Sequence, residues 1–399
     1  MNKESNRWEV LEHLGALVEK SLVVADGDVI PRYRMLETTR LFALERLIES
    51  GESESARRLH RDHYLALAED CERSLLFGET RRHLARLDVE RDNLFLALAW
   101  APRADDASPG LRLAAAMNSY WLMRAMPARG AEVTRVALER PGAKVPSPER
   151  CRALVTAGWM SMWAGAHDEA VRDLAEALEL ARGFADPRLL CLVLTRFAHV
   201  YLHHDELETA ARLASEAVNV ARPQESSIEL GYALMLRAHV HASRGEWQAA
   251  QSLYLEALEL RERMNNPSGM VSVYVSLAEL LIRQDCAAAA KSHIDRALAL
   301  LPRADSHYEA LSLIGLTAEW AAAMGHGELA VLLEIAEAKQ FEQAGFKFHS
   351  KVRESEHLKR ARLALSTDLL EHLDAAGRAL TYEQAIQRVR ALLSDGAPL

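Results

Sequence analysis

The segment ERCRALVTAGWMSMWAGAHDEAVRDLAEALELARG, residues 149–183, has the pattern of two helices joined by a short turn. Apolar and small residues recur every three or four positions on either side of Gly165, as they do along the buried face of an amphipathic helix. Asp168 follows the turn and can cap the second helix. Asp186 and Pro187 end the pattern, because proline cannot continue a helix. The segment therefore predicts a helical hairpin.

The hairpin pattern repeats with a period of 40 residues between residues 111 and 340. One column of the repeat keeps a small residue, where two helices touch closely: Gly130, Ala170, Ala210, Ala250, Ala290 and Ala330. Another column marks the turn between the helices: Ala125, Gly165, Asp205, Gly245, Asp285 and Gly325. Glycine and aspartate are typical turn residues. Columns that persist over six units indicate an internal repeat.

Each unit resembles the tetratricopeptide repeat in its order of small, bulky and turn residues, although units of that family are usually about 34 residues long. We therefore predict an all-α protein, a tetratricopeptide-like α-solenoid of about six 40-residue helical hairpins. Neighbouring hairpins share one continuous core, because a single hairpin cannot bury its own apolar face. Stacking also creates a concave groove that binds other molecules by shape, without chemistry.

The composition bounds the compartment and the partners of the chain. Its 399 residues are 49% hydrophobic and carry a formal net charge of -9 at pH 7. This charge argues against a surface dedicated to nucleic acid or to an anionic membrane. No apolar run reaches the ~18 residues of a membrane span, and the first residues have no signal core. We expect a cytoplasmic protein without membrane contact and without direct nucleic-acid binding.

The four cysteines lie within helical patterns and form no C-x-x-C pair: Cys71, Cys151, Cys191 and Cys286. We expect them to be small buried residues in a reducing compartment. Cys151 and Cys191 fall one repeat apart, which indicates a shared packing position rather than a disulfide.

The chain divides into four predicted segments. They are a partial winged helix with one β-hairpin (1–52), linking helices (53–104), the repeat array (105–345) and C-terminal capping helices (346–399). In the first segment, an apolar stripe from Trp8 to Val18 predicts a helix. Strands at 21–25 and 33–36 then flank an Asp-Gly turn at 26–28, and a second helix follows at 37–50. The linking segment has helical patterns at 54–75 and 80–100. Closing helices are predicted at 354–366 and 382–394.

Several stretches outside the central repeats resemble one bacterial group. They are LVEKSLVV (17–24), PRYRMLETTRLFALERLIESGE (31–52), RRLHRDHYLALAE (57–69) and LARLDVERDNLFLALAWA (84–101), with C-terminal agreement at 313–338, 353–365 and 377–393. The group is the STAND-type predicted ATPases and transcriptional regulators of the winged-helix or LuxR-like kind. In that group a P-loop ATPase core precedes the winged helix, and a tetratricopeptide array follows it. The resemblance therefore implies a role in signal transduction.

The phosphate-binding loop of that group is absent from these residues. It would read G-x-x-x-x-G-K-[ST], and the chain contains no Gly-Lys dipeptide. The ATPase of the group would lie upstream of Met1, so its nucleotide binding cannot be carried over to this chain. We expect the sensor arm of a larger or split regulator, with a separate P-loop ATPase module as a partner, or else a truncated descendant.

The family register predicts which first-helix residues face the groove. They are Arg152, Val155, Trp159, Met162, Trp163, Thr195, His199, His203, Tyr232, Met235 and His239. Trp159 and Trp163 lie on one helical face and can anchor an apolar peptide or stack on a sugar ring. The competing interpretation packs both indoles between adjacent hairpins, because aromatic stripes at helical spacing are usually core.

Three of these residues raise the question of a metal site. His199 and His203 are four residues apart, and His239 holds the column of His199 one repeat later. Such a set binds zinc only when further ligands complete it, and no Glu or Cys is placed to do so. We therefore predict no metal and no cofactor, and instead a pH-responsive or solvated histidine cluster.

The predicted function is recognition. No G-x-S-x-G motif occurs and no pair of catalytic carboxylates stands out, so we predict no enzyme activity. We predict a non-catalytic sensor arm of a bacterial STAND-type signalling ATPase or transcriptional regulator. Its partner would be a protein or peptide, or a small effector in the groove. The alternative is a free-standing tetratricopeptide scaffold for protein–protein interaction.

Overall fold

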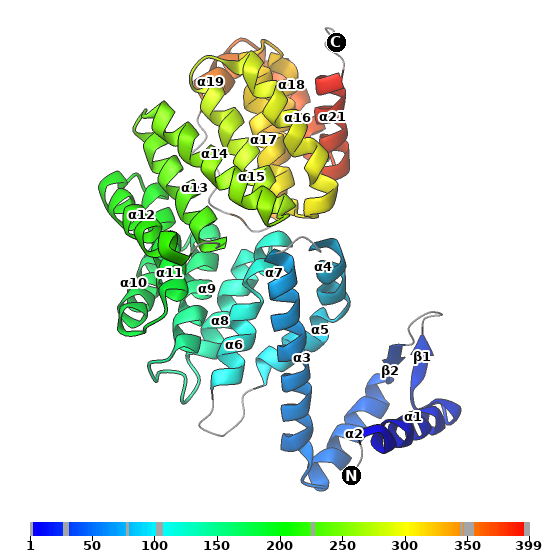
Figure 1. Ribbon diagram of the computed structural model, residues 1–399. Helices are drawn as coiled ribbons and strands as arrows, with labels where there is room; N and C mark the ends of the chain where they lie inside the picture. Colours follow the sequence, from blue (N-terminus) through cyan, green and yellow to red (C-terminus); the bar gives the residue numbers. More distant parts are fainter. Residues whose placement is uncertain are drawn as a thin grey trace. The chain divides into compact units, whose positions relative to one another are not determined.

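The computed structural model describes residues 3–26, 32–76, 80–100, 107–224, 228–343, 346 and 355–394 (Figure 1). These residues form helices almost throughout, with one two-stranded sheet. None of the helices in these ranges has both the length and the apolar character that a bilayer span requires. The chain divides into two compact units, Met1–His60 and Arg61–Leu399.

The first unit has the predicted order of helix, hairpin and helix. Its elements are α1 (Lys3–Glu19), β1 (Val24–Asp26), β2 (Arg32–Arg34) and α2 (Glu37–Glu49). The strands pair antiparallel with Ala25 opposite Tyr33. The first strand begins later than predicted, because Ser21 has a φ of 55° and continues the turn after α1. Part of the predicted Asp-Gly turn, residues 27 and 28, lies outside the described residues.

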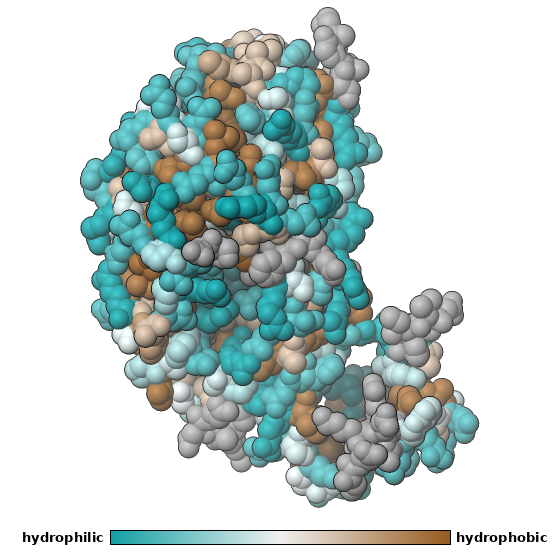
Figure 2. Space-filling model, viewed as in Figure 1, coloured by the Kyte–Doolittle hydropathy of each residue, from teal (hydrophilic) through white to brown (hydrophobic). Residues whose placement is uncertain are grey.

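Large apolar side chains are exposed on the first unit. They include Trp8, Val10, Leu11, Leu36, Leu41, Phe42 and Ile48. Trp8 keeps 74% of its surface exposed, although tryptophan is highly buried on average in folded proteins. Figure 2 shows hydrophobic residues at the surface of this unit, where Figure 1 labels α1 and α2. Grouped exposed apolar residues of this kind are typical of a contact surface for another protein segment.

The linking segment differs from the sequence prediction in one element. α3 (Ser53–Leu76) matches its prediction, but the helix predicted at 80–100 is divided into α4 (Thr80–Val89) and α5 (Arg91–Ala99). The division falls at Glu90, whose carboxylate accepts hydrogen bonds from the Tyr64 hydroxyl and the Asn93 amide. The Tyr64 contact joins residues 26 positions apart, and helical periodicity does not contain it.

The repeat array in the described ranges consists of six helical hairpins that stack in chain order (Figure 1). The first is irregular, because its first helix is divided into α6 (Ser108–Ala116) and α7 (Asn118–Met123) before α8 (Pro127–Leu138). The regular hairpins are α9–α10 (Pro148–Trp163, His167–Gly183), α11–α12 (Pro187–His203, Leu207–Ala221), α13–α14 (Ile228–Ser243, Trp247–Arg263), α15–α16 (Pro267–Ile282, Ala287–Ala304) and α17–α18 (His307–Ala323, Gly327–Gln343). The predicted tetratricopeptide-like α-solenoid is confirmed.

All six residues of the turn column adopt a left-handed backbone. The φ angle lies between 56° and 89° at Ala125, Gly165, Asp205, Gly245, Asp285 and Gly325. In each unit the next residue donates its backbone N–H to the carbonyl five positions earlier, for example Ala166 to Ser161 at 2.8 Å. This bond closes the C-terminal end of a helix. The column prefers glycine and aspartate because they tolerate the left-handed region better than most residues.

The small-residue column is buried between the two helices of each hairpin. The regular hairpins bury it completely, at Ala170, Ala210, Ala250, Ala290 and Ala330. In the first hairpin, a Cβ atom added to Gly130 would lie 2.7 Å from Cγ of Trp121. The indole therefore occupies the space that a side chain would need.

The C-terminal part contains one helix that was not predicted. α19 (Glu356–Leu363) and α21 (Tyr382–Ser394) fall within the predicted closing helices, but α20 (Thr367–Ala379) does not. α20 packs on α18, and a Cβ atom at Gly377 would lie 2.8 Å from Cγ2 of Ile335. Ser366 caps α20 by accepting the N–H of Leu369. This cap, followed by leucines at helical spacing, was the signal available in the sequence.

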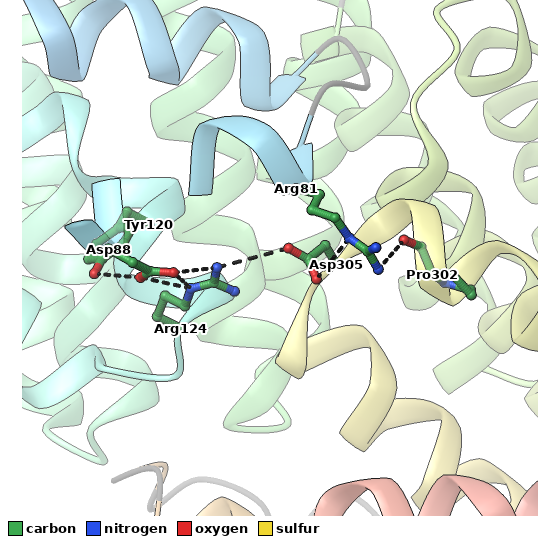
Figure 3. A network of polar contacts seen from close by, with 6 residues as sticks. All are labelled: Arg81, Asp88, Tyr120, Arg124, Pro302 and Asp305. Carbon is green, nitrogen blue, oxygen red and sulfur yellow. Dashed lines mark hydrogen bonds and ion pairs between the residues drawn. The ribbon is translucent and has the colours of Figure 1, made fainter. Parts of the chain in front are cut away.

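A polar network ties the irregular start of the array to α16 (Figure 3). Arg124, which follows α7, binds Asp88 of α4 through Nε and Nη2 at 3.0 and 2.7 Å. It also lies 3.9 Å from Asp305 at the end of α16. Arg81 of α4 lies 3.8 Å from Asp305 and donates to the carbonyl oxygen of Pro302 at 3.1 Å. Segments far apart in the sequence are therefore joined by ion pairs.

Candidate functional site

The first helices of the five regular hairpins surround a cavity. Two adjoining spaces of about 200 and 220 Å³ share residues of α9, α11, α13, α15 and α17. The shared residues are Trp163, His199, His239, Ser276, Glu279, Tyr308 and Ser312. We call the two spaces together the central cavity. The first helices are those that the repeat register assigned to the groove.

Side chains bridge the array across the central cavity. The ring centroid of Trp163 in α9 lies 5.1 Å from that of Tyr308 in α17, and 5.7 Å from that of Phe346. Rings at these distances are in packing contact. The groove predicted from stacking alone is therefore bridged between the first and last regular hairpins rather than open along its length.

The structure brings most of the predicted groove residues to this cavity. Eight of them line it: Trp159, Trp163, Thr195, His199, His203, Tyr232, Met235 and His239. Val155 and Met162 are buried in the core. Arg152 is exposed and forms an ion pair with Glu72 at 3.1 Å. Binding of a partner by these residues stays a prediction.

The two tryptophans pack together and also border the cavity. Trp159 and Trp163 are 3% and 7% exposed, and their ring centroids lie 5.5 Å apart at right angles. The Trp159 ring contacts His199 of the next hairpin at 4.9 Å. The indoles are therefore buried between helices, as the packing interpretation requires, while their edges form part of the cavity wall.

The histidine cluster lies in the cavity wall and is held neutral. The rings of His199 and His203 are 4.3 Å apart, and Nε2 of His239 lies 3.0 Å from Oγ of Ser276. Burial lowers the pKa of His199 well below its ordinary value, and lowers the pKa of His203 to about 3. Burial also lowers the pKa of His239. In the described ranges no three His, Cys, Asp or Glu side chains are grouped to hold a metal ion.

Sequence reasoning missed the charged residues of the cavity. Arg196, Arg261 and Glu309 line it. The guanidinium carbon of Arg196 lies 4.0 Å from the ring centroid of Trp159, and Glu309 accepts a hydrogen bond from Ser268 at 2.8 Å. A signal did exist for Arg261. It interrupts a repeat column whose members in the other regular hairpins are apolar and buried: Ala181, Ala221, Leu301 and Phe341.

No protein-family model matches the chain. Two predicted HTH-type transcriptional regulators, from Mycobacterium tuberculosis and Mycobacterium bovis, are each 31% identical to it over 283 residues. The matched region is 68% of this chain and 32% of each relative, so the chain spans about a third of the length of the curated relatives it matches.

Solved structures share the fold at low sequence identity. A Rap protein complexed with Competence and Sporulation Factor aligns with a TM-score of 0.51 and 11% identity, over 86% of this chain and 99% of that chain. A STAND protein with a tetratricopeptide repeat sensor, from Pyrococcus horikoshii, aligns with a TM-score of 0.43 and 13% identity, over 91% of this chain and 60% of that chain. The likeness to these structures concerns the fold alone.

Proposed function

We propose that this chain is the ligand- or partner-sensing arm of a bacterial regulator of the STAND or HTH type, and that it acts by recognition rather than catalysis. The observation that carries the proposal is the central cavity, which five successive hairpins build from their first helices. A concave site with aromatic walls and a few polar groups is the usual form of a small-ligand site. The similarity to transcriptional regulators supports the regulatory role.

A ligand in the cavity would act on the spacing between hairpins. Trp163 and Tyr308 belong to α9 and α17, so a ligand that contacts both rings joins the two ends of the regular array. The ion pairs of Arg124 with Asp88 and Asp305 join a second set of distant segments (Figure 3). The ligand shifts such an array only by its differential affinity for two arrangements. A shift from 1:99 to 99:1 requires about 10⁴-fold tighter binding to one of them.

A cavity-filling variant tests this proposal. Ser312 lines both spaces of the cavity, so Ser312→Trp should block it. Ser252→Trp, on an exposed position of α14, is the matched control. Wild type and both variants are purified as the full chain from the cells that produce it, checked by circular dichroism, and analysed by native mass spectrometry for retained molecules.

The wild type and Ser252→Trp should retain the same small molecule or partner, and a folded Ser312→Trp should lose it. Equal retention by Ser312→Trp would place recognition outside the cavity. Hydrolysis of ATP by the purified chain would contradict the non-catalytic role.

A second candidate function is a protein-interaction scaffold that needs no ATPase. The exposed apolar residues of the first unit favour it, above all Trp8 and Phe42 at 74% and 59% exposure. In this case Trp8→Ser/Phe42→Ser would lose a protein partner that Ser312→Trp still captures. Loss of the partner in both variants would favour the sensor function instead.

A further inference from the structure

One side chain of the central cavity carries a charge that the described residues leave unpaired. Arg261 of α14 has no exposed surface. Its Nε, Nη1 and Nη2 atoms have no hydrogen-bond partner in the part of the chain that the structure describes. A buried charge without a partner is strongly unfavourable, and each unsatisfied group of this kind requires an explanation. Arg261 also borders the cavity, so a ligand there is the explanation that supplies a partner.

The surroundings of Arg261 hold its guanidinium in one place. An added Cβ atom at Gly269 would lie 2.7 Å from Cδ of Arg261, and one at Gly231 would lie 3.1 Å from Nε. A side chain at Gly269 would therefore displace Arg261, and one at Gly231 would press against it. The Tyr232 ring covers one face of the guanidinium, with Cζ 4.1 Å from the ring centroid. Stacking satisfies the face of the ion, whereas its N–H groups point outward in the plane and need acceptors.

The indole N–H of Trp159, at the same cavity, has the same requirement. Nε1 of Trp159 is buried and finds no acceptor among the described residues, and the indole N–H is a donor only. Arg196 lies between the rings of Trp159 and Tyr232, with its Cζ atom 4.0 and 5.2 Å from their centroids. The cavity wall thus contains two guanidinium groups, and the Arg261 guanidinium and the Trp159 indole N–H lack acceptors among the described residues.

The charged residues that line the cavity determine the net charge of a ligand that would balance them. Three arginines line it, Arg196, Arg261 and Arg283, against two carboxylates, Glu279 and Glu309. The two carboxylates have their own partners, since Glu279 lies 4.0 Å from Arg283 and Glu309 accepts hydrogen bonds from serines. The histidines of the wall are held neutral by burial, which lowers their pKa. One positive charge therefore remains unbalanced.

We propose that the central cavity binds a ligand with a single carboxylate. Arg261, which is enclosed without ligand, becomes accessible as the neighbouring side chains move aside, and it then holds this carboxylate through paired N–H···O hydrogen bonds. The planar guanidinium matches a carboxylate in a bidentate arrangement. A phosphate monoester carries about -1.5 to -2 charges at pH 7, which would leave excess negative charge beside Glu309. The apolar part of the ligand lies against Trp163 and Tyr308. This assignment rests on the proposed function, because it names the class of ligand for the same cavity.

Binding of simple probes to the full chain tests the carboxylate. The probes are 4-phenylbutyrate, its uncharged primary amide and phenyl phosphate, measured by isothermal titration calorimetry. Arg261→Met removes the charge at similar volume. Arg182→Met is the matched control, because Arg182 is exposed on α10, pairs with Glu216 at 3.1 Å and is not among the residues that line the cavity. We expect 4-phenylbutyrate to bind about 10- to 100-fold more weakly to Arg261→Met than to the wild type. The uncharged amide should bind the wild type more weakly than 4-phenylbutyrate does, by about the same factor. The control should change by less than about 3-fold.

The thermal stability of the chain without ligand is a second readout. A ligand-binding role and a packing role of Arg261 predict opposite changes in it. If Arg261 serves to bind a ligand, Arg261→Met removes a buried charge that is unpaired without the ligand, and the midpoint of thermal unfolding stays level or rises. If Arg261 is only a packing residue, the midpoint falls.

The proposal is overturned if 4-phenylbutyrate does not bind the wild type, or binds Arg261→Met equally well. Equal binding of acid and amide would also overturn it, and tighter binding of phenyl phosphate would overturn the single-carboxylate assignment. In each case a natural ligand lost only by Ser312→Trp would leave the proposed function standing.

Discussion

The contact between Trp163 and Tyr308 tests whether the array is bridged, because only tertiary structure brings these residues together. Trp163→Ala should lower the free energy of unfolding by about 3 kcal/mol, which is at the lower end of the usual cost of truncating a buried Trp to Ala. The cost is at the lower end because part of the ring borders the cavity and is not packed against other side chains. Tyr308→Ala, at a half-buried position, should cost about 1–2 kcal/mol. The double variant should cost about 0.5–1.5 kcal/mol less than the sum of the two, because the aromatic pair is lost only once.

The assay is urea unfolding of the full chain followed by far-UV circular dichroism. The control cycle combines Trp163→Ala with Tyr274→Ala, a buried tyrosine that stacks on His293 instead. The control pair should be additive within about 0.5 kcal/mol. A coupling energy for Trp163 and Tyr308 no larger than that of the control would refute the bridge between α9 and α17.

Three further predictions follow from named groups. Burial lowers the pKa of His203 to about 3, so the unfolded state protonates first as the pH falls, and the free energy of unfolding should decline below about pH 6.5. His203→Gln should reduce this decline, measured by urea unfolding at pH 5 and pH 7.5. An unchanged decline in the variant would contradict the prediction. Burial raises the pKa of Cys151 to about 12, so iodoacetamide should label the exposed Cys286 of the native protein and spare Cys151. Peptide mass spectrometry measures the labelling of each cysteine, and equal labelling of the two would contradict the prediction. Arg124→Ala removes the paired bonds to Asp88 and should lower the free energy of unfolding by about 1–2 kcal/mol. Arg129→Ala, which removes an exposed i,i+3 ion pair, should lower it by less than about 0.5 kcal/mol. Similar losses for the two variants would mean that the network in Figure 3 contributes little.

The sequence predicted the elements of the array well because its repeat is a local pattern. Gly165 and Asp205 mark turns whose left-handed backbone excludes most residues. Ala170 and its counterparts are small because two helices touch there in every unit. The sequence also predicted that the first helices line the groove, and α9, α11, α13, α15 and α17 line the central cavity. The division into four segments remains a prediction.

The errors of sequence reasoning arose where contacts are not local. The chain breaks a continuous helical pattern at Glu90, whose carboxylate binds Tyr64, 26 positions earlier in the chain. α20 was missed because its apolar face is short and is covered by α18. Cys286 was expected to be buried like the other cysteines, but it is exposed. It precedes α16, at a turn, where the helical pattern does not decide burial.

The sequence by itself determined the repeating hairpin and its turns, because both depend on residues within one 40-residue unit. The tertiary structure decided how far the stack curls, and therefore that Trp163 meets Tyr308 and bridges the groove over the cavity. It also decided that Arg261 is enclosed by Gly231, Gly269 and Tyr232 without a hydrogen-bond partner in the described residues. Curvature is a sum of small rotations between successive units, and no single unit of the sequence contains that sum.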